Sequence, residues 1–463
     1  MQREIPLAIN VDEGDIAGHA TNINMFVEKT EGGKYSFTIQ GTEGLAVYAD
    51  VGYATGIMAL HSTGDEETGR RDFAITRTAL FELNSDGTIT NHGAITLNGK
   101  RVVAAQNGIQ LVFVDGIRGY SFTLATNTLT QIVSEGFYPA RTVTFQDGYF
   151  IFDRLGTREF FISQLQSDTF DAADFASAEG QPDNIVAVMS DHRELFLFGT
   201  GSIEVWYNSG GVDFPFERSQ GAFIEKGCAA PYSIQKTNNT IYFLGSDFMV
   251  YSLSGYTPVR ISTHAVEQDF RGLDLTDVFA YTYAIKGHLF YVLTIPAINK
   301  TWVYDIATNV WHIRQNSQFG RHVSNNCIAS RGKNLVGDFQ SGLIYELSFD
   351  ALTDNGDEII RQFQLPTVNL GRKISSFGSL EIDMETGIGQ TNGPSQEPRA
   401  VLEFSKDKSK TWSNQKFASM GKKGKYATRV KWNRLGAARQ MDFKIKISGE
   451  CKLSIGGAWV EVM

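Results

Sequence analysis

Histidine and cysteine side chains are the first candidates for metal chemistry in this sequence. The eight histidines are His19, His61, His92, His192, His264, His288, His312 and His322. No two of them stand at the i, i+2 or i, i+4 spacing that builds a local zinc motif. Cys228, Cys327 and Cys451 lie about a hundred residues or more apart, whereas a disulfide framework or a thiolate metal site needs clustered cysteines. We therefore expect three separate reduced thiols and no bound metal.

Acidic residues with basic neighbours are the candidates for acid–base catalysis. Asp153 precedes Arg154, and Asp191 precedes His192 and Arg193. Both groups border apolar, strand-like runs at positions where turns commonly carry charged side chains, so we interpret them as turn residues. The chain also has no phosphate-binding glycine loop with its lysine and no G-x-S-x-G elbow. The sequence therefore predicts no catalytic residues, no cofactor and no enzyme activity.

One local pattern resembles a known structural motif. The segment 405–412, Ser-Lys-Asp-Lys-Ser-Lys-Thr-Trp, is similar to the Asp-box hairpin of sialidase-type propellers, with Ser409 where that motif prefers glycine. In such hairpins the Asp and Ser side chains bind turn amides, and the Trp anchors the hairpin on the sheet. The resemblance implies a structural turn. A sialidase-like carbohydrate-active enzyme remains an alternative, which would also require an arginine cluster and a paired tyrosine and acid.

Short apolar strands recur along the chain and must position all of these residues. Their anchors are Phe73, Leu111, Tyr149, Leu195, Ile241, Leu289 and Leu335, which are 38 to 48 residues apart. Each anchor strand is followed by a turn and a second apolar or aromatic strand, and most are preceded by another. Three to four strands in about 40 to 48 residues is the size of one propeller blade. The sequence therefore predicts an all-β protein with a seven-bladed β-propeller.

The repeat divides the chain into three predicted parts. Residues 53–364 form the propeller, and residues 365–463 form a smaller β domain, either a sandwich or a barrel. Residues 1–52 form an N-terminal arm, in which strands at 35–39 and 45–49 either complete the last blade or stay separate. We interpret the Gly-, Pro- and Gln-rich segment 385–398 as a long hairpin connection.

Charge is divided unevenly along the chain. Between residues 399 and 446 fourteen Lys and Arg stand against three acids, a balance of +11, while the whole chain carries −9. The other 415 residues therefore carry −20. The basic segment is either the solvent-facing side of alternating strands or a surface for an acidic partner. As a candidate electrostatic interface we select Lys422, Lys423, Lys425, Arg429, Lys431, Arg434 and Arg439.

Composition restricts the class of protein further. The chain is 42% hydrophobic and 12% aromatic, which favours a folded β-rich protein over disorder. No stretch approaches the roughly 20 apolar residues that span a bilayer as a helix, so we expect no integral membrane segment. The first 18 residues contain no apolar core of signal-peptide length, so we expect no Sec-dependent secretion.

Four segments resemble a phage protein family through their order and spacing. Residues 181–210 read QPDNIVAVMSDHRELFLFGTGSIEVWYNSG, and EKGCA follows at 225–229. Upstream stands RTVTFQDGYFIFDRLGTREFFISQ at 141–164, with NINM at 22–25 and KWNRLGAARQMDFKIKIS at 431–448. Together they are similar to the packaged-DNA stabilisation protein family of short-tailed bacteriophages, the tail hub or nozzle. The rest of the arm before Tyr35 and the segment 385–398 have no counterpart in that pattern.

The resemblance implies a structural virion protein of the phage tail, assembled in the host cytoplasm. Such proteins form a homohexameric ring below the portal and its adaptor ring, extend the DNA channel and help to retain the packaged genome until ejection. They also dock the tail needle or plug and the tail spikes or fibres, while double-stranded DNA passes without sequence-specific binding. The alternative from another class is a β-propeller interaction module outside a virion.

Overall fold

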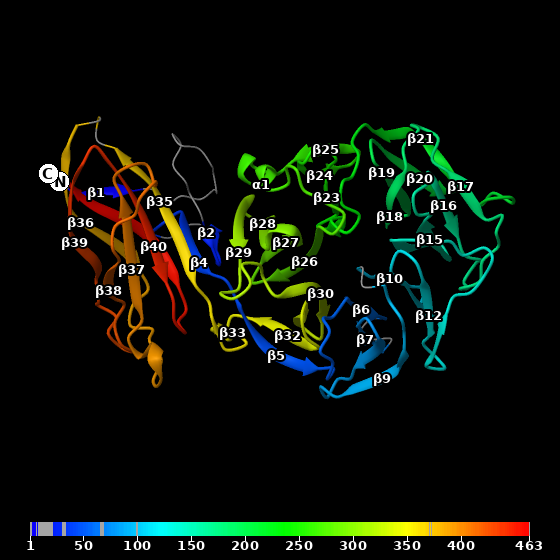
Figure 1. The fold of residues 1–463 in the computed structure, drawn as a ribbon, viewed down its shortest axis with the longest axis horizontal. Coiled ribbons are helices and arrows are strands. Elements are labelled where there is room, and N and C mark those ends of the chain that lie inside the picture. Colours follow the sequence, from blue (N-terminus) through cyan, green and yellow to red (C-terminus); the bar gives the residue numbers. More distant parts are fainter. Residues whose placement is uncertain are drawn as a thin grey trace.

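The computed structural model describes residues 2–5, 7, 22–29, 34–64, 69–98, 101–369, 371 and 373–462. Strands dominate these residues, and the helical elements among them are α1 (His264–Gln268) and the 3-10 turns η1 (Pro296–Ile298) and η2 (Pro394–Gln396). A ring of small sheets lies beside a two-layered β domain (Figure 1). No helix in the described residues is long and apolar enough to cross a membrane.

Seven four-stranded antiparallel blades form the ring in the described part of the chain. The first blade has β6 (Ala59–Thr63), β7 (Arg71–Ile75), β8 (Ala79–Leu83) and β9 (Ile89–Ala94). The second has β10 (Val103–Gln106), β11 (Gln110–Val114), β12 (Gly119–Thr123) and β13 (Thr128–Gln131). The third has β14 (Val143–Gln146), β15 (Tyr149–Asp153), β16 (Glu159–Ile162) and β17 (Phe175–Ser177).

The remaining blades repeat this order. The fourth has β18 (Ile185–Asp191), β19 (Glu194–Gly199), β20 (Ile203–Asn208) and β21 (Phe216–Ile224), and the fifth has β22 (Gln235–Thr237), β23 (Thr240–Leu244), β24 (Val250–Ser254) and β25 (Thr257–Arg260). The sixth has β26 (Phe279–Ile285), β27 (His288–Ile295), β28 (Lys300–Asp305) and β29 (Val310–Arg314). The seventh has β30 (Ser324–Ser330), β31 (Lys333–Asp338), β32 (Leu343–Ser348) and β5 (Gly44–Asp50). Every predicted anchor lies in the second strand of its blade, which confirms the repeat.

The N-terminal strand β5 closes the ring. It pairs antiparallel with β32, so that Leu45 lies opposite Leu347 and Ala49 opposite Ile344. The small strands β33 (Thr353–Asp354) and β34 (Asp357–Glu358) extend the same sheet beyond β5. Of the two alternatives left open by the sequence, the strand predicted at 45–49 therefore completes the last blade. The strand predicted at 35–39 does not, because β4 (Phe37–Gly41) pairs with strands of the second domain.

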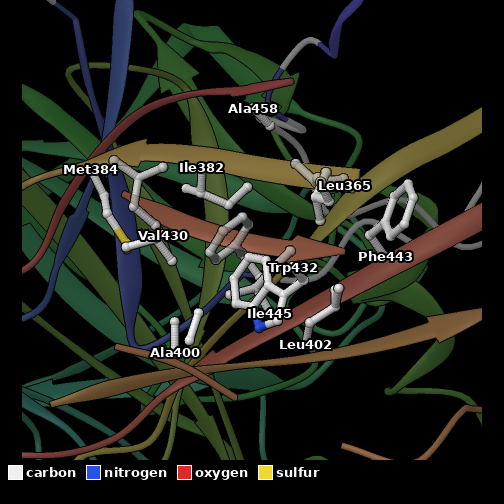
Figure 2. Packing of buried hydrophobic residues seen from close by; sticks show 14 of the residues in the cluster. Leu365, Ile382, Met384, Ala400, Leu402, Val430, Trp432, Phe443, Ile445 and Ala458 are labelled. Carbon is white, nitrogen blue, oxygen red and sulfur yellow. The ribbon is translucent and has the colours of Figure 1, made fainter. Parts of the chain in front are cut away.

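Two sheets form that second domain, which is a sandwich. One contains β3 (Met25–Lys29), β4, β41 (Ser454–Val462), β36 (Ser375–Met384) and β39 (Val430–Ala438), with β1 (Gln2–Ile5) also on β41. The other contains β35 (Arg361–Asn369), β40 (Gln440–Ile447), β37 (Arg399–Ser405) and β38 (Lys416–Ser419). Figure 2 shows their inner faces meeting, with Ile382 and Val430 from one sheet and Leu402 and Ile445 from the other.

The segment 385–398 is not a hairpin connection, so that prediction was wrong. It joins β36 to β37, which belong to opposite sheets of the sandwich. The Glu385 N–H donates to Ser454 O and the Gly387 N–H to Met420 O, so the chain is held as it crosses. Glycine, proline and glutamine mark a loop but carry no information about which sheet the next strand joins.

A continuous sheet connects the propeller to the sandwich. The two-residue strand β2 (Asn22–Ile23) pairs parallel with β29 of the sixth blade and antiparallel with β35 of the sandwich. The resulting sheet has nine strands, from β26 to β38. β35 itself spans residues 361–369, across the position where the sequence placed the domain boundary. The segment 22–50 thus contributes strands to both bodies.

Candidate functional site

The seven basic residues selected from the sequence lie around one edge of the sandwich. Lys422, Lys423 and Lys425 are exposed in the turn before β39, where the Lys425 N–H donates to Lys422 O at 2.9 Å. β39 is the outermost strand of its sheet and carries the half-buried Lys431 and the exposed Arg434. The other two members, Arg429 and Arg439, flank this strand and are also exposed. The tertiary structure therefore keeps the segment together along one strand and its flanking turns.

Acidic side chains of the same domain already form ion pairs with two of these basic residues. Arg429 donates from Nε and Nη2 to the Glu381 carboxylate at 2.7 and 2.5 Å, and these bonds lower the pKa of Glu381. Lys431 Nζ lies 4.0 Å from Glu461 Oε2. Among the described residues, no acid lies within ion-pair distance of the three turn lysines. The turn Lys422, Lys423 and Lys425, called here the lysine turn, therefore has charge available for a partner, as does the exposed Arg434.

All three cysteines are free thiols that are buried or half-buried in the fold. Cys228 and Cys451 are buried and Cys327 is half-buried, and none forms a disulfide. Burial raises the pKa of Cys228 to about 12. A thiol with such a pKa is a poor nucleophile and a poor metal ligand at neutral pH. The described residues also contain no group of three His, Cys, Asp or Glu side chains able to hold a metal ion.

The acid–base groups considered as catalytic lie at strand ends, with Asp153 ending β15 and Asp191 ending β18. Asp153 is fully buried and accepts bonds from the Arg141 and Thr142 N–H groups at 3.0 and 2.6 Å. His192 lies in the turn between β18 and β19 with a φ of 49°, and its ring lies 2.9 Å from Asp191. Asp153 is therefore a buried strand residue that holds the chain before β14, and not the turn residue that the sequence predicted.

The Asp-box segment forms the expected hydrogen bonds. The Thr411 N–H donates to Asp407 Oδ1 at 2.9 Å, and the Ser409 N–H donates to Ser405 Oγ at 3.0 Å. Bonds from Thr411, first its hydroxyl and then its N–H, lower the pKa of Asp407 to about 2. Trp412 packs under Lys444, whose Nζ lies 3.8 Å from the ring centroid. Ser409 has a φ of 61°, which explains why the related motif prefers glycine there.

A cavity of about 430 Å³ lies at the axis of the propeller. The first strands of all the blades described above line it, and its charged side chains are Arg101 and Lys236. Arg101 donates to Asn325 Oδ1 and O at 2.9 and 2.6 Å and stacks 3.5 Å from the Phe279 centroid. No Asp or Glu is among the described lining residues. The cavity therefore does not gather the acids and arginines that the sialidase-like alternative requires.

Sequence reasoning missed a buried ion pair where the propeller meets the N-terminal segment. Arg314, on β29, is 1% exposed and donates from Nη1 to Glu43 Oε1 at 2.5 Å and from Nη2 to Glu43 O at 3.0 Å. The Tyr283 hydroxyl donates to the same carboxylate oxygen at 2.6 Å. No local pattern marks this pair, because its members are 271 positions apart in the sequence. The available signal in the sequence was Glu43 itself, an acid that stands between the two strands predicted at 35–39 and 45–49.

Asn24 and His288 are two further links that the sequence did not identify. Asn24 Nδ2 donates to Gln315 O and Ile360 O, both at 2.9 Å, and its Oδ1 accepts from the Gln315 N–H. His288 of the sixth blade contacts Asp305 and Glu28, each at 2.8 Å, and Glu28 lies on a sandwich strand. Asn24 belongs to the NINM segment at 22–25, one of the segments that resemble the phage family. That segment therefore contains a residue that bonds Gln315 and Ile360.

Comparison with known proteins identifies the family. A model described as bacteriophage P22 Gp10, beta-propeller, matches residues 18–352, and a second, bacteriophage P22 Gp10, beta-sandwich, matches residues 360–463. These are the two bodies seen in the structure. The protein is a structural component of a bacteriophage virion. The chain belongs to the bacteriophage P22 Gp10 family, as its resemblance to the phage stabilisation proteins implied.

Several solved structures align with parts of this chain at low sequence identity. The computationally designed Ika8 protein aligns at 13% identity and a TM-score of 0.37, over 66% of this chain and all of that one. The extracellular domain of the one-component system BT4673 from B. thetaiotaomicron aligns at 12% identity and a TM-score of 0.45, over 83% of this chain and 48% of that one. YCF48 bound to D1 peptide aligns at 8% identity and a TM-score of 0.39, over 64% and 93% of the two chains. A search of curated proteins finds no match.

Proposed function

We propose that this chain forms a homohexameric tail hub, or nozzle, below the portal and its adaptor ring. The ring would extend the DNA channel, help to retain packaged DNA, and dock the tail needle or plug and the tail spikes or fibres. The observation that carries the proposal is the match of both bodies of the chain to one phage structural family. Assembly would take place in the host cytoplasm, and the protein would then reside in the virion tail.

The fold is suited to a tube that must withstand pressure. A propeller leaves few exposed sheet edges, and here β5 covers the edge of β32 that would otherwise be free. The nine-stranded sheet ties the sandwich to the sixth blade through backbone hydrogen bonds. Relative movement of the two bodies would break that ladder, which favours a rigid subunit.

Charge supplies a second, independent argument. An acidic surface facing the channel would repel DNA phosphates and let the duplex slide, whereas a basic lining would bind it tightly. The basic segment would then face an acidic surface on a neighbouring ring or subunit. Within it, the lysine turn has charge that no described internal acid binds.

Charge reversal at the lysine turn tests this arrangement. The triple variant Lys422→Glu, Lys423→Glu, Lys425→Glu should lower incorporation into portal-containing particles at least about tenfold, as expected when several interface charges become repulsive. The matched control reverses Lys406, Lys408 and Lys410, which are exposed in the same domain and give the same change in net charge. Copies per particle are measured by quantitative mass spectrometry. Equal incorporation of the two variants would contradict the assignment of the interface.

The hub itself is tested by mass measurement of particles assembled with and without this chain. Six copies per portal-containing particle, together with DNA leakage when the chain is missing, are the expected results. The measurement uses particles because a preceding ring can act as the template for assembly. A chain that never joins particles but binds a host protein through its sandwich would instead indicate the alternative, an interaction module outside the virion.

A further inference from the structure

A small pocket lies between the propeller and the sandwich, apart from the lysine turn. Its volume is about 180 Å³. The lining comes from β3 and β4, from the chain after β32, from the start of β35, and from residues 385, 452 and 453. This volume is well above the roughly 10–15 Å³ that one water needs. It is below the roughly 300 Å³ at which pockets for drug-sized ligands begin.

A buried arginine with unused donors forms one wall of this pocket. Arg361 is 2% exposed, and its enclosed Nε and Nη1 atoms have no hydrogen-bond partner among the described residues. A buried guanidinium without partners is unfavourable, so such donors normally bind an acceptor. Among the described residues, Asp354 is the acid whose charge acts on Arg361, yet no ion pair joins the two. The guanidinium therefore has donors that no described residue binds.

The surrounding backbone makes room for this guanidinium. A Cβ added at Gly41 would lie only 2.6 Å from Arg361 Nε, so any larger residue there would displace the side chain. Gly41 ends β4 and pairs with Met25, which fixes its position in the sandwich sheet. The absence of a side chain at position 41 thus lets the guanidinium pack directly against the end of β4.

Other charges around the pocket leave it positive. Lys286 stands 3.8 Å from the Phe349 ring centroid, and Lys452 Nζ lies 3.5 Å from Asp350, which is 93% exposed. Glu28 is already bound to His288 at 2.8 Å. The remaining carboxylate in the lining, Glu385, is exposed. The described lining therefore holds three cations and two acids; outside it, Asp350 pairs with Lys452 and the charge of Asp354 acts on Arg361.

We propose that this pocket binds a small oxyanion through the Arg361 guanidinium, with Lys286 at the rim. Guanidinium groups bind carboxylates and phosphates through paired, parallel hydrogen bonds, and burial strengthens such bonds. The pocket admits an anion of the size of phosphate or a carboxylate group but not a nucleotide-sized ligand. Its occupant is either a free anion or the carboxylate side chain of a partner, and it would lock the two bodies together because the lining comes from both.

Thermal unfolding of the full chain with added anions tests the proposal. At constant ionic strength set with chloride, inorganic phosphate or acetate should raise Tm in a saturable way, because a ligand that binds only the folded state stabilises it. A response to phosphate indicates a free-anion site, and a response to acetate alone indicates a carboxylate side chain as the occupant. The proposal is overturned if neither anion raises Tm beyond the chloride control.

Variants separate this pocket from nonspecific anion effects. Arg361→Gln should abolish the saturable shift, whereas Arg434→Gln, which removes an exposed arginine of the same domain, should leave it unchanged. If Arg361→Gln does not fold, Lys286→Gln and Gly41→Ala should each weaken binding at least tenfold, the first at the rim and the second by crowding the guanidinium. Unchanged binding in both of these variants would assign the effect to another surface.

Discussion

Glu43 and Arg314 form a pair of charges that cannot be separated without a large cost. Both side chains are buried, and Tyr283 shares the same carboxylate oxygen. Removing one member of a buried pair leaves an uncompensated charge, which typically costs about 3–5 kcal/mol. We therefore expect Glu43→Gln to lower the free energy of unfolding in urea by that amount. The double variant Glu43→Gln, Arg314→Met should recover part of the loss, and a single variant as stable as the wild type would contradict the role of the pair.

His288 gives the protein a stability limit at alkaline pH. The bond to Asp305, together with that to Glu28, raises the pKa of His288 to about 9, against an ordinary value near 6.5. Because the folded-state pKa is raised, the stabilisation is complete below about pH 6.5 and is lost as the pH rises through 9. His288→Gln should be about 1–3 kcal/mol less stable than wild type at pH 6, with the difference shrinking by pH 10. Urea titrations across this range measure the difference, and a gap independent of pH would contradict the charged histidine.

His312 contributes to the opposite, acidic limit, together with His61 and the buried His322. His312 is 1% exposed, and burial lowers its pKa to about 3. A lowered folded-state pKa means that its contribution is present above about pH 6.5 and is lost as the pH falls toward 3. His312→Phe, which keeps an aromatic ring beside Phe290, should flatten the acid limb of the stability curve. An acid limb identical to that of the wild type would assign the loss to other groups.

At the scale of the element, the closing strand β5 completes the seventh blade by pairing with β32. Leu45 on β5 is 2% exposed and packs in the core shared by the sixth and seventh blades, whereas Val47, two residues on, is 52% exposed. Leu45→Ala should cost about 2–5 kcal/mol because it leaves a cavity in that core. Val47→Ala, the matched control on the same strand, should change stability by less than about 0.5 kcal/mol. Chemical denaturation compares the two, and equal effects would show that β5 is not packed as described.

At the scale of the whole molecule, we expect Asn24 to couple the unfolding of the two bodies. Its side chain makes three bonds, to Gln315 of the propeller side and to Ile360 beside the sandwich, with a φ of 54°. Asn24→Gly keeps that backbone conformation but loses the bonds, so we expect a loss of about 1–3 kcal/mol and a split or broadened calorimetric transition. Asn24→Asp, which retains the acceptor, should lie between this variant and wild type. A single unchanged transition in Asn24→Gly would assign the coupling to β2 alone.

Much of the architecture was open to prediction because it repeats. Apolar anchors such as Leu111 and Tyr149 occur at blade spacing, and each lies in the second strand of its blade. The basic segment near Lys422 was also readable, since charge along one strand and its turns stays together in any fold. Arg361 and Glu43 were not readable, because a single charged residue in sequence does not reveal whether its neighbours in space leave it paired or unpaired.

The sequence by itself determined seven blades, a smaller β domain, distant thiols and a basic segment set against an acidic remainder. Each of these depends on local spacing or on sums along the chain, which folding cannot alter. Only the tertiary structure decided that β5 closes the ring, that β4 joins the sandwich and that β2 links the two bodies. These strands pair with partners up to about 400 positions away. Alternation of apolar residues indicates that a segment can form a strand, but it does not indicate which strand it pairs with. The partners are fixed by the strand edges that the rest of the folded chain leaves unpaired, which are those of β32, β41 and β29.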